Sequence, residues 1–223
     1  QLGRDMTAAC EKSGFAVQGI DIPDINITDA KSTRAIVASA KPDVIVNCAA
    51  YTAVDAAETN SDAAFAINAD GVANLAKAAD SCGAAIVHFS TDYVFDGRAN
   101  QPYVETDATN PLSVYGKSKL AGEQKLLSIC EQYAIIRISW LYGAHGGNFV
   151  KTIRNVAKKK AETGEALSVV SDQVGTPTCT LDVCRQTLAI IAEKAYGIFH
   201  GTSEGMCSWY DFAVKIAELS GFQ

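Results

Sequence analysis

The fold follows from one stretch near the middle of the chain, Ala84-Ala85-Ile86-Val87-His88-Phe89, which continues as Ser90-Thr91-Asp92-Tyr93-Val94-Phe95-Asp96-Gly97. The first half is an apolar run that leads into a polar loop, and such a run predicts a buried parallel strand. Loops at the carboxyl ends of parallel strands are where open α/β sheets bind ligands. We therefore expect the hydroxyl and carboxyl groups of this loop to be functional.

A second informative stretch is Tyr115-Gly116-Lys117-Ser118-Lys119. On a helix, the spacing of Tyr115 and Lys119 brings the phenol and the ammonium to one face. A nearby cation favours the tyrosinate, so we expect the pKa of the Tyr115 phenol to lie below its usual value of about 10. Tyr115 could then give a proton to a carbonyl oxygen that is being reduced, while Thr91 donates a second hydrogen bond. Taken alone, the same spacing also occurs on ordinary helix surfaces.

Strand and helix patterns alternate along the chain, which predicts an α/β fold with a Rossmann-like, doubly wound parallel sheet. Besides the central strand, strands are expected at Phe15–Asp21, Asp43–Ala50, Ala134–Ser139, Leu167–Val170 and Gly197–His200. Helices are expected at Leu2–Lys12, Ala30–Ala40 and Ser113–Cys130, with a helix-rich region over Ala56–Asp80 and a capping box at Ser208. Asn68, inside the helix-rich region, is interpreted as a structural hydrogen bonder.

Composition narrows the class of protein. With 223 residues, 48% of them hydrophobic, the chain can bury a sizeable core, and its net charge of −6 argues against a nucleic-acid partner. The seven cysteines include no Cys-x-x-Cys pair, which favours reduced core thiols and a cytoplasmic location. The histidines, at 88, 145 and 200, are scattered, so no metal site is indicated. No apolar run approaches the roughly 20 residues of a membrane span, so no membrane partner is expected.

The combination of motifs is more specific than any one of them. Ser90–Gly97 is followed by Pro102-Tyr103-x-Glu105, by Asn110-Pro111-Leu112 and by Tyr115-Gly116-Lys117-Ser118-Lys119-Leu120-Ala121-Gly122-Glu123. This series closely resembles the dTDP-4-dehydrorhamnose reductase family of extended short-chain dehydrogenases, and the match runs through nearly the whole chain. The resemblance implies NAD(P)H-dependent reduction of the 4-keto group of dTDP-4-dehydro-L-rhamnose, a nucleotide sugar, in polysaccharide biosynthesis.

The resemblance also implies two domains. Residues 1–145 would form the NAD(P)-binding Rossmann-like domain, and residues 146–223 would mostly form a small C-terminal substrate-binding lobe, interleaved with the sheet. In the family, Gln-Leu-Gly follows directly on a first strand and a Gly-x-x-Gly turn, and further residues complete the lobe. Because this chain opens on Gln1-Leu2-Gly3 and stops at Gly221-Phe222-Gln223, we expect the natural protein to be longer at both ends.

The expected site residues fall into three sets. The catalytic set is Tyr115, Lys119 and Thr91, and the substrate-binding set is Thr91, Asp92 and Trp140. The cofactor-binding set, for NADPH or NADH, is Gln1, Leu2, Asp21, Asn26, Ile27, Ala49, Ala50, Tyr51, Thr52, Phe89, Tyr115 and Lys119. No metal ligand is assigned; Mg²⁺ is used by some family members at a dimer contact, so a homodimer and Mg²⁺ stay open, although no pattern indicates the metal.

Several of these assignments have an ordinary structural alternative. Asp21 lies about where an acidic residue binds an adenosine ribose, which favours NADH, but it fits a plain loop aspartate nearly as well. Asn26 departs from the aspartate that the family often has there. The small residues Ala49 and Ala50 suit a close approach of phosphates, or a simple strand-to-helix turn. A tryptophan such as Trp140 is more commonly a core residue.

Two other functions compete with the reductase. A nucleotide-sugar epimerase or dehydratase of the same superfamily would share Tyr115 and Lys119, although a dehydratase normally has an acid–base pair beside the threonine, where this chain has Asp92 followed by Tyr93. A non-catalytic relative, such as the regulatory subunit of methionine adenosyltransferase, is expected to have lost the substrate-contacting Asp and the Ser-Trp pair. This chain has Asp92, Ser139 and Trp140, which favours the enzyme.

Overall fold

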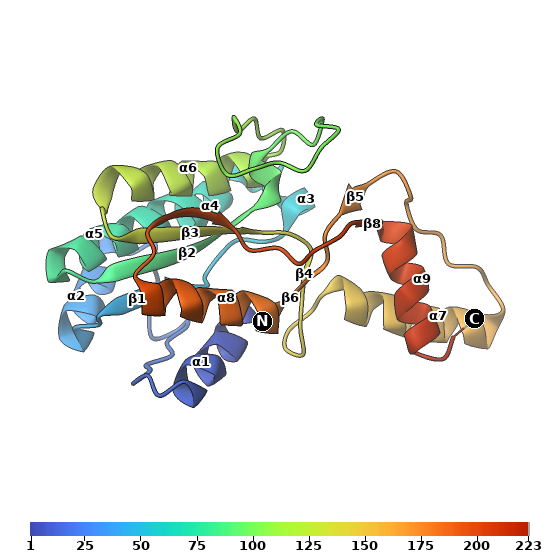
Figure 1. The fold of residues 1–223 in the computed structure, drawn as a ribbon, viewed down its shortest axis with the longest axis horizontal. Helices are drawn as coiled ribbons and strands as arrows, with labels where there is room; N and C mark the ends of the chain where they lie inside the picture. The colour runs from blue at the N-terminus through green and yellow to red at the C-terminus, as the bar shows by residue number, and fades with distance from the viewer. Residues whose placement is uncertain (223) are drawn as a thin grey trace. The chain divides into compact units, whose positions relative to one another are not determined.

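The computed structural model describes residues 1–222, which form two compact units (Figure 1). The first comprises Gln1–Ala16, Ser139–Gln186 and the described part of Gly201–Gln223, and is called here the aromatic unit. The second comprises Val17–Ile138 and Thr187–His200, and is called the sheet unit. The predicted domains were defined by the ligand that each binds, so their boundary after residue 145 stays a prediction.

The sheet unit contains a four-stranded sheet in the order β1-β2-β3-β7. Its strands are β1 (Val44–Asn47), β2 (Ala85–Thr91), β3 (Tyr133–Ile138) and β7 (Gly197–His200). All three neighbouring pairs are parallel, with Val87 opposite Val46 on one side and opposite Ala134 on the other. The prediction of a Rossmann-like parallel sheet is confirmed, and β2, which contains the apolar run Ile86–Phe89, is one of its two inner strands.

Helices α5 and α6 pack on β2, and α2 packs against α5 (Figure 1). The helical segments of this unit are α2 (Ala30–Ala40), α3 (Val54–Ala57), α4 (Ser61–Phe65), the π-helical η1 (Ala66–Gly71), α5 (Val72–Cys82), the 3-10 turn η2 (Asp92–Val94) and α6 (Val114–Ile129). Side chains cap three of them, because Asp29 accepts from the backbone N–H groups of Lys31 and Ser32, Ser113 accepts from that of Gly116, and Thr91 accepts from that of Tyr93. Local capping chemistry therefore helps to fix where these three segments begin.

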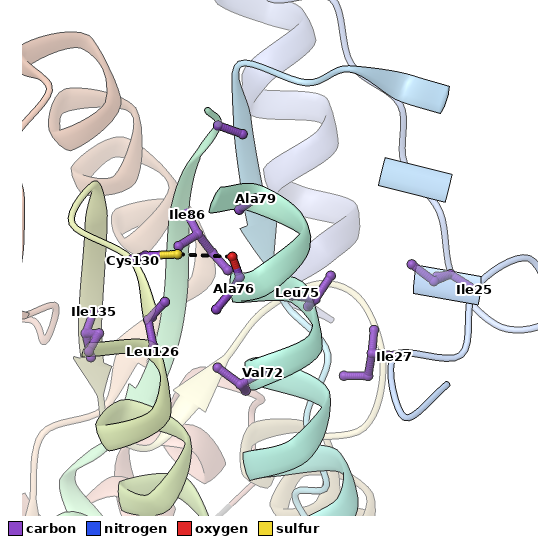
Figure 2. Packing of buried hydrophobic residues seen from close by; sticks show 11 residues of the cluster. Ile25, Ile27, Val72, Leu75, Ala76, Ala79, Ile86, Leu126, Cys130 and Ile135 are labelled. Atoms are coloured by element: carbon purple, nitrogen blue, oxygen red, sulfur yellow. Dashed lines mark hydrogen bonds between the residues drawn. The ribbon is translucent and has the colours of Figure 1, made fainter. Parts of the chain in front are cut away.

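The core of the sheet unit lies where α5 and α6 meet the sheet (Figure 2). Ile86 of β2, Leu126 of α6 and Ile135 of β3 are completely buried. The thiol of Cys130 donates to the carbonyl oxygen of Ala76 over 3.1 Å, so this cysteine acts as a small core residue. None of the seven cysteines forms a disulfide among the described residues.

The aromatic unit is built from short strands and three long helices. Its elements are α1 (Leu2–Lys12), β4 (Leu141–Tyr142), α7 (Phe149–Thr163), β5 (Val174–Gly175), β6 (Thr178–Cys179), β8 (Cys207–Ser208) and α9 (Trp209–Leu219), and α8 (Thr180–Glu193) begins in it. Strand β4 pairs with β6 in parallel, and β5 pairs with β8 in antiparallel fashion. The predicted capping box is confirmed, since Ser208 and Asp211 exchange side-chain and backbone hydrogen bonds.

Two predicted strands are wrong. Neither Phe15–Asp21 nor Leu167–Val170 forms a strand, because no strand of the described residues pairs with either segment. A strand needs a ladder partner, whereas an apolar pattern signals only a tendency toward burial. In the first segment even that tendency is unmet, since Phe15 is 44% and Ile20 is 40% exposed.

None of the helices in the described part of the chain combines the length and apolar character of a membrane span.

Candidate active site

The carboxyl edge of the parallel sheet is fixed by one buried amide. Asn68 is completely buried, and its Oδ1 accepts from the backbone N–H of Tyr51 over 2.8 Å. Its Nδ2 donates to the carbonyl oxygen of Tyr51 over 3.0 Å and to the hydroxyl of Ser118 over 2.9 Å. The loop after β1 is thereby tied to α6, and the structural role predicted for Asn68 is confirmed.

Two glycines let α6 approach this edge closely. A Cβ atom on Gly116 would lie 2.2 Å from the carbonyl oxygen of Tyr93, and one on Gly122 would lie 2.1 Å from that of Asn68. Real Cβ atoms do not tolerate such distances, so only glycine fits at either position. The helix that carries Tyr115 and Lys119 is thus seated against η2 and η1.

Thr91, Asp92 and Tyr115 come together at the end of β2. The Thr91 hydroxyl donates to Asp92 Oδ1 over 3.1 Å and accepts from the backbone N–H of Tyr93 over 3.2 Å. The Thr91 side chain also lies beside the phenol of Tyr115, and it lowers the pKa of that phenol. The structure therefore brings together three of the residues that the sequence assigned to the reacting centre.

The acid–base character of this cluster differs from the expectation. Burial raises the pKa of Tyr115 to about 12, the charges of Asp92 and Tyr93 raise it further, and the neighbouring Thr91 side chain lowers it. The expected lowering of the Tyr115 pKa is wrong in this structure, because desolvation of the phenolate outweighs any cation. Burial likewise raises the pKa of Asp92 to about 6, although hydrogen bonds from Thr91 and from backbone N–H groups lower it. At neutral pH the phenol holds its proton, as a proton donor must.

Lys119 is 1% exposed and points toward the sheet. Its ammonium nitrogen donates to the carbonyl oxygen of Phe89 over 2.7 Å and lies 3.3 Å from His88 Nε2. Burial lowers the pKa of Lys119 to about 8, and the charge of Glu123 raises it. Lys119 is therefore able to change its charge near neutral pH.

His88 and Asn47 are polar residues of the site region that the sequence analysis did not assign. His88 is completely buried in β2, and its Nδ1 lies 3.1 Å from Nδ2 of Asn47, which ends β1. Burial, with the charge of Lys119, lowers the pKa of His88 well below its ordinary value. The available signal was a histidine inside an otherwise apolar strand.

One turn further along α6, Glu123 binds Arg137 of β3. The guanidinium donates from Nε to Glu123 Oε1 over 3.1 Å and from Nη2 to Oε2 over 2.7 Å, and both side chains are at least 96% buried. Arg137 also donates to the carbonyl oxygen of Glu105 over 3.4 Å and lies over the ring of Phe95, 5.1 Å from its centroid. This bidentate pair anchors α6 to the sheet.

Some of the predicted cofactor residues lie at the carboxyl edge of the sheet. Ala49, Ala50 and Thr52 are exposed in the loop that follows β1, and Tyr51 is partly buried between them. Small exposed side chains leave the backbone open at the strand ends, where dinucleotides bind in such sheets. The residues present at this edge therefore fit a nicotinamide cofactor.

Other predicted cofactor residues of the sheet unit have local structural partners. Asp21 is exposed, and its Oδ1 accepts from the backbone N–H of Ile22 over 2.8 Å. Asn26 Oδ1 accepts from the backbone N–H of Thr28 over 3.1 Å and from its hydroxyl over 2.9 Å. Ile27 belongs to the core and is 9% exposed.

The remaining predicted site residues belong to the aromatic unit. Gln1 donates from Nε2 to the carbonyl oxygen of Leu141 over 3.2 Å and accepts at Oε1 from Asn148 over 2.7 Å, whereas Leu2 is buried. Trp140 stacks on Trp209, with ring centroids 3.4 Å apart and planes 10° apart. Its backbone has a φ of 44°, a strained value for a bulky residue.

No group of three or more His, Cys, Asp or Glu side chains among residues 1–222 is arranged to hold a metal ion. Separately, Thr91, Asp92, Tyr115 and Lys119 form a proton-transfer and hydrogen-bonding site at the end of a parallel strand, next to a loop that fits a nucleotide.

Comparison with known proteins connects this geometry to a family. The family model described as the RmlD substrate binding domain matches residues 1–223. The chain is 44% identical to a dTDP-4-dehydrorhamnose reductase of Aggregatibacter actinomycetemcomitans, over 97% of this chain and 74% of the relative.

Solved structures agree with this match. A dTDP-4-dehydrorhamnose reductase from Clostridium acetobutylicum is 48% identical, with a TM-score of 0.96, and the match covers all of this chain and 78% of the other. One from Bacillus anthracis, solved in complex with NADP, is 38% identical, with a TM-score of 0.95 and the same coverage.

Proposed function

This chain belongs to the RmlD substrate binding domain family, and from that premise we propose that it reduces the 4-keto group of dTDP-4-dehydro-L-rhamnose to the alcohol of dTDP-L-rhamnose, using NADPH or NADH. The observation that carries this function is the phenol of Tyr115, which keeps its proton at neutral pH and lies beside Thr91 at the end of β2. The relatives named dTDP-4-dehydrorhamnose reductase support the choice of substrate.

The proposed roles follow from which atoms can donate. A bound nicotinamide cofactor would supply the hydride. Tyr115 would donate its proton to the substrate oxygen on which negative charge develops. Thr91 now donates to Asp92, and rotation of that one hydroxyl would turn its hydrogen bond to the same oxygen. Asp92 would then be released to accept a hydroxyl of the sugar.

We propose that the cofactor binds mainly within residues 1–145, along Ala49–Thr52 and Phe89, with Gln1, Leu2, Asp21, Asn26 and Ile27 completing its site. Lys119 would reach the ribose hydroxyls, and residues 146–223 would mostly bind the substrate, with Trp140 packing on it. The exposed small side chains after β1 support the first part. The strained backbone of Trp140 supports a functional role for that residue, because strain of this kind concentrates at functional sites.

We also propose that the enzyme works in the cytoplasm, where nicotinamide cofactors are available, and that it forms a homodimer. Analytical ultracentrifugation of the full-length protein would test the assembly. A monomer at micromolar concentration would exclude the dimer.

The decisive test is oxidation of NADH and NADPH by the full-length protein with dTDP-4-dehydro-L-rhamnose. We expect turnover, and we expect Tyr115→Phe to lower kcat by roughly 10²- to 10⁴-fold because the proton donor is lost. Tyr196→Phe is the matched control, since this exposed phenol binds Gln132 instead. Full activity of Tyr115→Phe would remove Tyr115 from the mechanism. Clear cofactor binding without turnover would favour a regulatory relative.

A further inference from the structure

A line of buried polar atoms runs from the end of β1 to the middle of α6, all within the sheet unit. The backbone N–H of Ala49 donates to Asn47 Oδ1 over 3.1 Å, and Asn47 Nδ2 lies 3.1 Å from His88 Nδ1. His88 Nε2 lies 3.3 Å from Lys119 Nζ, which donates to the carbonyl oxygen of Phe89 over 2.7 Å. Asn47, His88 and Lys119 are each at most 4% exposed, so the contacts among these three side chains are shielded from solvent.

The backbone N–H of Ala49 determines where the hydrogen atoms lie in this series of contacts. A backbone N–H can only donate, so the Asn47 atom that faces Ala49 must be the amide oxygen. The amide nitrogen of Asn47 then faces His88, and it too can only donate. His88 Nδ1 must therefore accept, which places the imidazole proton on Nε2.

That proton points at Lys119. A charged ammonium has three N–H groups and no lone pair, so it cannot accept from His88 Nε2–H. A neutral amine can accept there and can still donate to the carbonyl oxygen of Phe89. The arrangement fixed by Ala49 and Asn47 is thus compatible with neutral Lys119 and opposes charged Lys119.

We propose that Asn47 and His88 are positioning residues that keep Lys119 exchangeable, because they hold the imidazole as its Nε2–H tautomer and direct that N–H at the lysine nitrogen. Neither residue would touch the substrate. Their catalytic value rests on the proposed function, in which Tyr115, one helical turn before Lys119 on α6, is the proton donor. The tautomer and the ionisation do not depend on that function.

Other charged groups around Lys119 do not cancel the preference for a neutral Lys119 amine. Glu123, on the same helix, raises the pKa of Lys119, yet burial outweighs it and the pKa falls to about 8. Glu123 is engaged by two hydrogen bonds from Arg137 of β3. From β2 the titratable neighbour is His88, whose own lowered pKa keeps the imidazole neutral.

The first test needs no substitution and no substrate. In the full-length protein labelled with ¹⁵N-histidine, the imidazole nitrogen shifts of His88 report its tautomer directly. We expect the proton on Nε2 between pH 6 and 9. A proton on Nδ1 would overturn the inference.

The second test reverses which atoms donate and which accept in the hydrogen bonds between residue 47, His88 and Lys119. In Asn47→Asp the carboxylate accepts from Ala49 and can also accept from His88 Nδ1–H, so Nε2 becomes an acceptor for the ammonium. Titration of ¹³Cε-labelled lysine should then show the pKa of Lys119 raised by about one unit or more. Asn100→Asp, which adds the same charge at an exposed position, should leave that pKa unchanged.

An unchanged Lys119 pKa in folded Asn47→Asp would overturn the inference, whether or not the protein reduces the proposed sugar. If Asn47→Asp does not fold, the His88 tautomer measured in the wild-type protein still decides whether the inference holds. In an active enzyme, the limb of the kcat–pH profile that belongs to Lys119 should move with the titration. If the titration moves and the profile does not, the ionisation of Lys119 has no part in the proposed reaction, while the tautomer assignment stands.

Discussion

Two buried cations lie at helix α6 in opposite settings: Lys119 belongs to the helix, and Arg137 of β3 packs against it. Arg137 donates two hydrogen bonds, of 3.1 and 2.7 Å, to the carboxylate of Glu123. Lys119, one helical turn before Glu123, has no carboxylate partner among residues 1–222 and contacts the carbonyl oxygen of Phe89 and the imidazole of His88. Burial therefore lowers the pKa of Lys119 to about 8.

The difference shows how one helix can serve structure and chemistry together. A guanidinium matches a carboxylate with two parallel hydrogen bonds and does not lose its proton, so the Arg137 pair is a permanent connection. A buried ammonium without a carboxylate sheds its charge readily, which suits a group that exchanges protons. Removing a partner from the first pair and removing the charge of the second should thus change stability in opposite directions.

Glu123→Gln should have the largest effect. It leaves the guanidinium of Arg137 buried and unpaired, so we expect the free energy of unfolding at pH 7 to fall by roughly 3–5 kcal/mol. Urea denaturation with a Glu165→Gln control, which removes an exposed partner of Lys160, would measure it. A loss below about 1 kcal/mol would show that the pair is not an anchor. The apolar double variant Glu123→Leu, Arg137→Met should regain most of the loss, because no charge is then left buried.

Lys119→Met should act in the opposite direction. The pKa of Lys119 is lowered from 10.5 to about 8, so between these values the unfolded chain binds more protons and stability rises with pH. Below pH 8 the folded protein carries the full penalty, about 3 kcal/mol from a difference of roughly 1.4 kcal/mol per unit.

Lys119→Met should therefore raise the free energy of unfolding at pH 7 by up to about 3 kcal/mol, and the gain should vanish near pH 10.5. Thermal unfolding across this range, with the exposed Lys117→Met as the matched control, would measure it. A less stable variant at pH 7 would mean that packing, and not charge, dominates at this position.

This contrast marks the limit of what the sequence could predict. The bounds of α2 and the presence of α6 followed from capping residues and apolar spacing. Spacing also put Tyr115 and Lys119 on one helix, but it could not show what that helix meets. The pKa of Tyr115 rises to about 12 because its surroundings are desolvated, and those surroundings come from residues distant in sequence.

The same limit applies to partners of single residues. His88 contacts Lys119, 31 residues later, and Trp140 stacks on Trp209, 69 residues later. No local pattern encodes either pair. The Phe15–Asp21 segment failed as a strand for the related reason that pairing requires a neighbour, which periodicity does not specify.

Asp92→Asn tests whether a partly buried carboxylate at the site loses stability with ionisation, as the ammonium of Lys119 does. The pKa of Asp92 is raised from 3.8 to about 6, so between these values the folded protein binds more protons and stability falls as pH rises. Part of the Asp92 side chain remains exposed to solvent, which weakens the effect. We therefore expect the free energy of unfolding of the variant to rise by on the order of 2 kcal/mol at pH 8 and not to change near pH 4. Chemical denaturation at both values, with the exposed Asp172→Asn as control, would measure it. An equal gain at both pH values would exclude titration of Asp92 as the cause.

The smallest effect is expected from a third charge on α6. Lys125 binds Asp70, and their side chains are 43% and 60% exposed, so water already solvates both charges. Asp70→Asn should change the free energy of unfolding by less than about 0.5 kcal/mol, and 1 M salt should abolish the difference. Urea denaturation at low and high salt, beside Glu123→Gln, would place the two carboxylates on one scale. A salt-independent loss as large as that of Glu123→Gln would show that burial does not decide what a charge on this helix contributes.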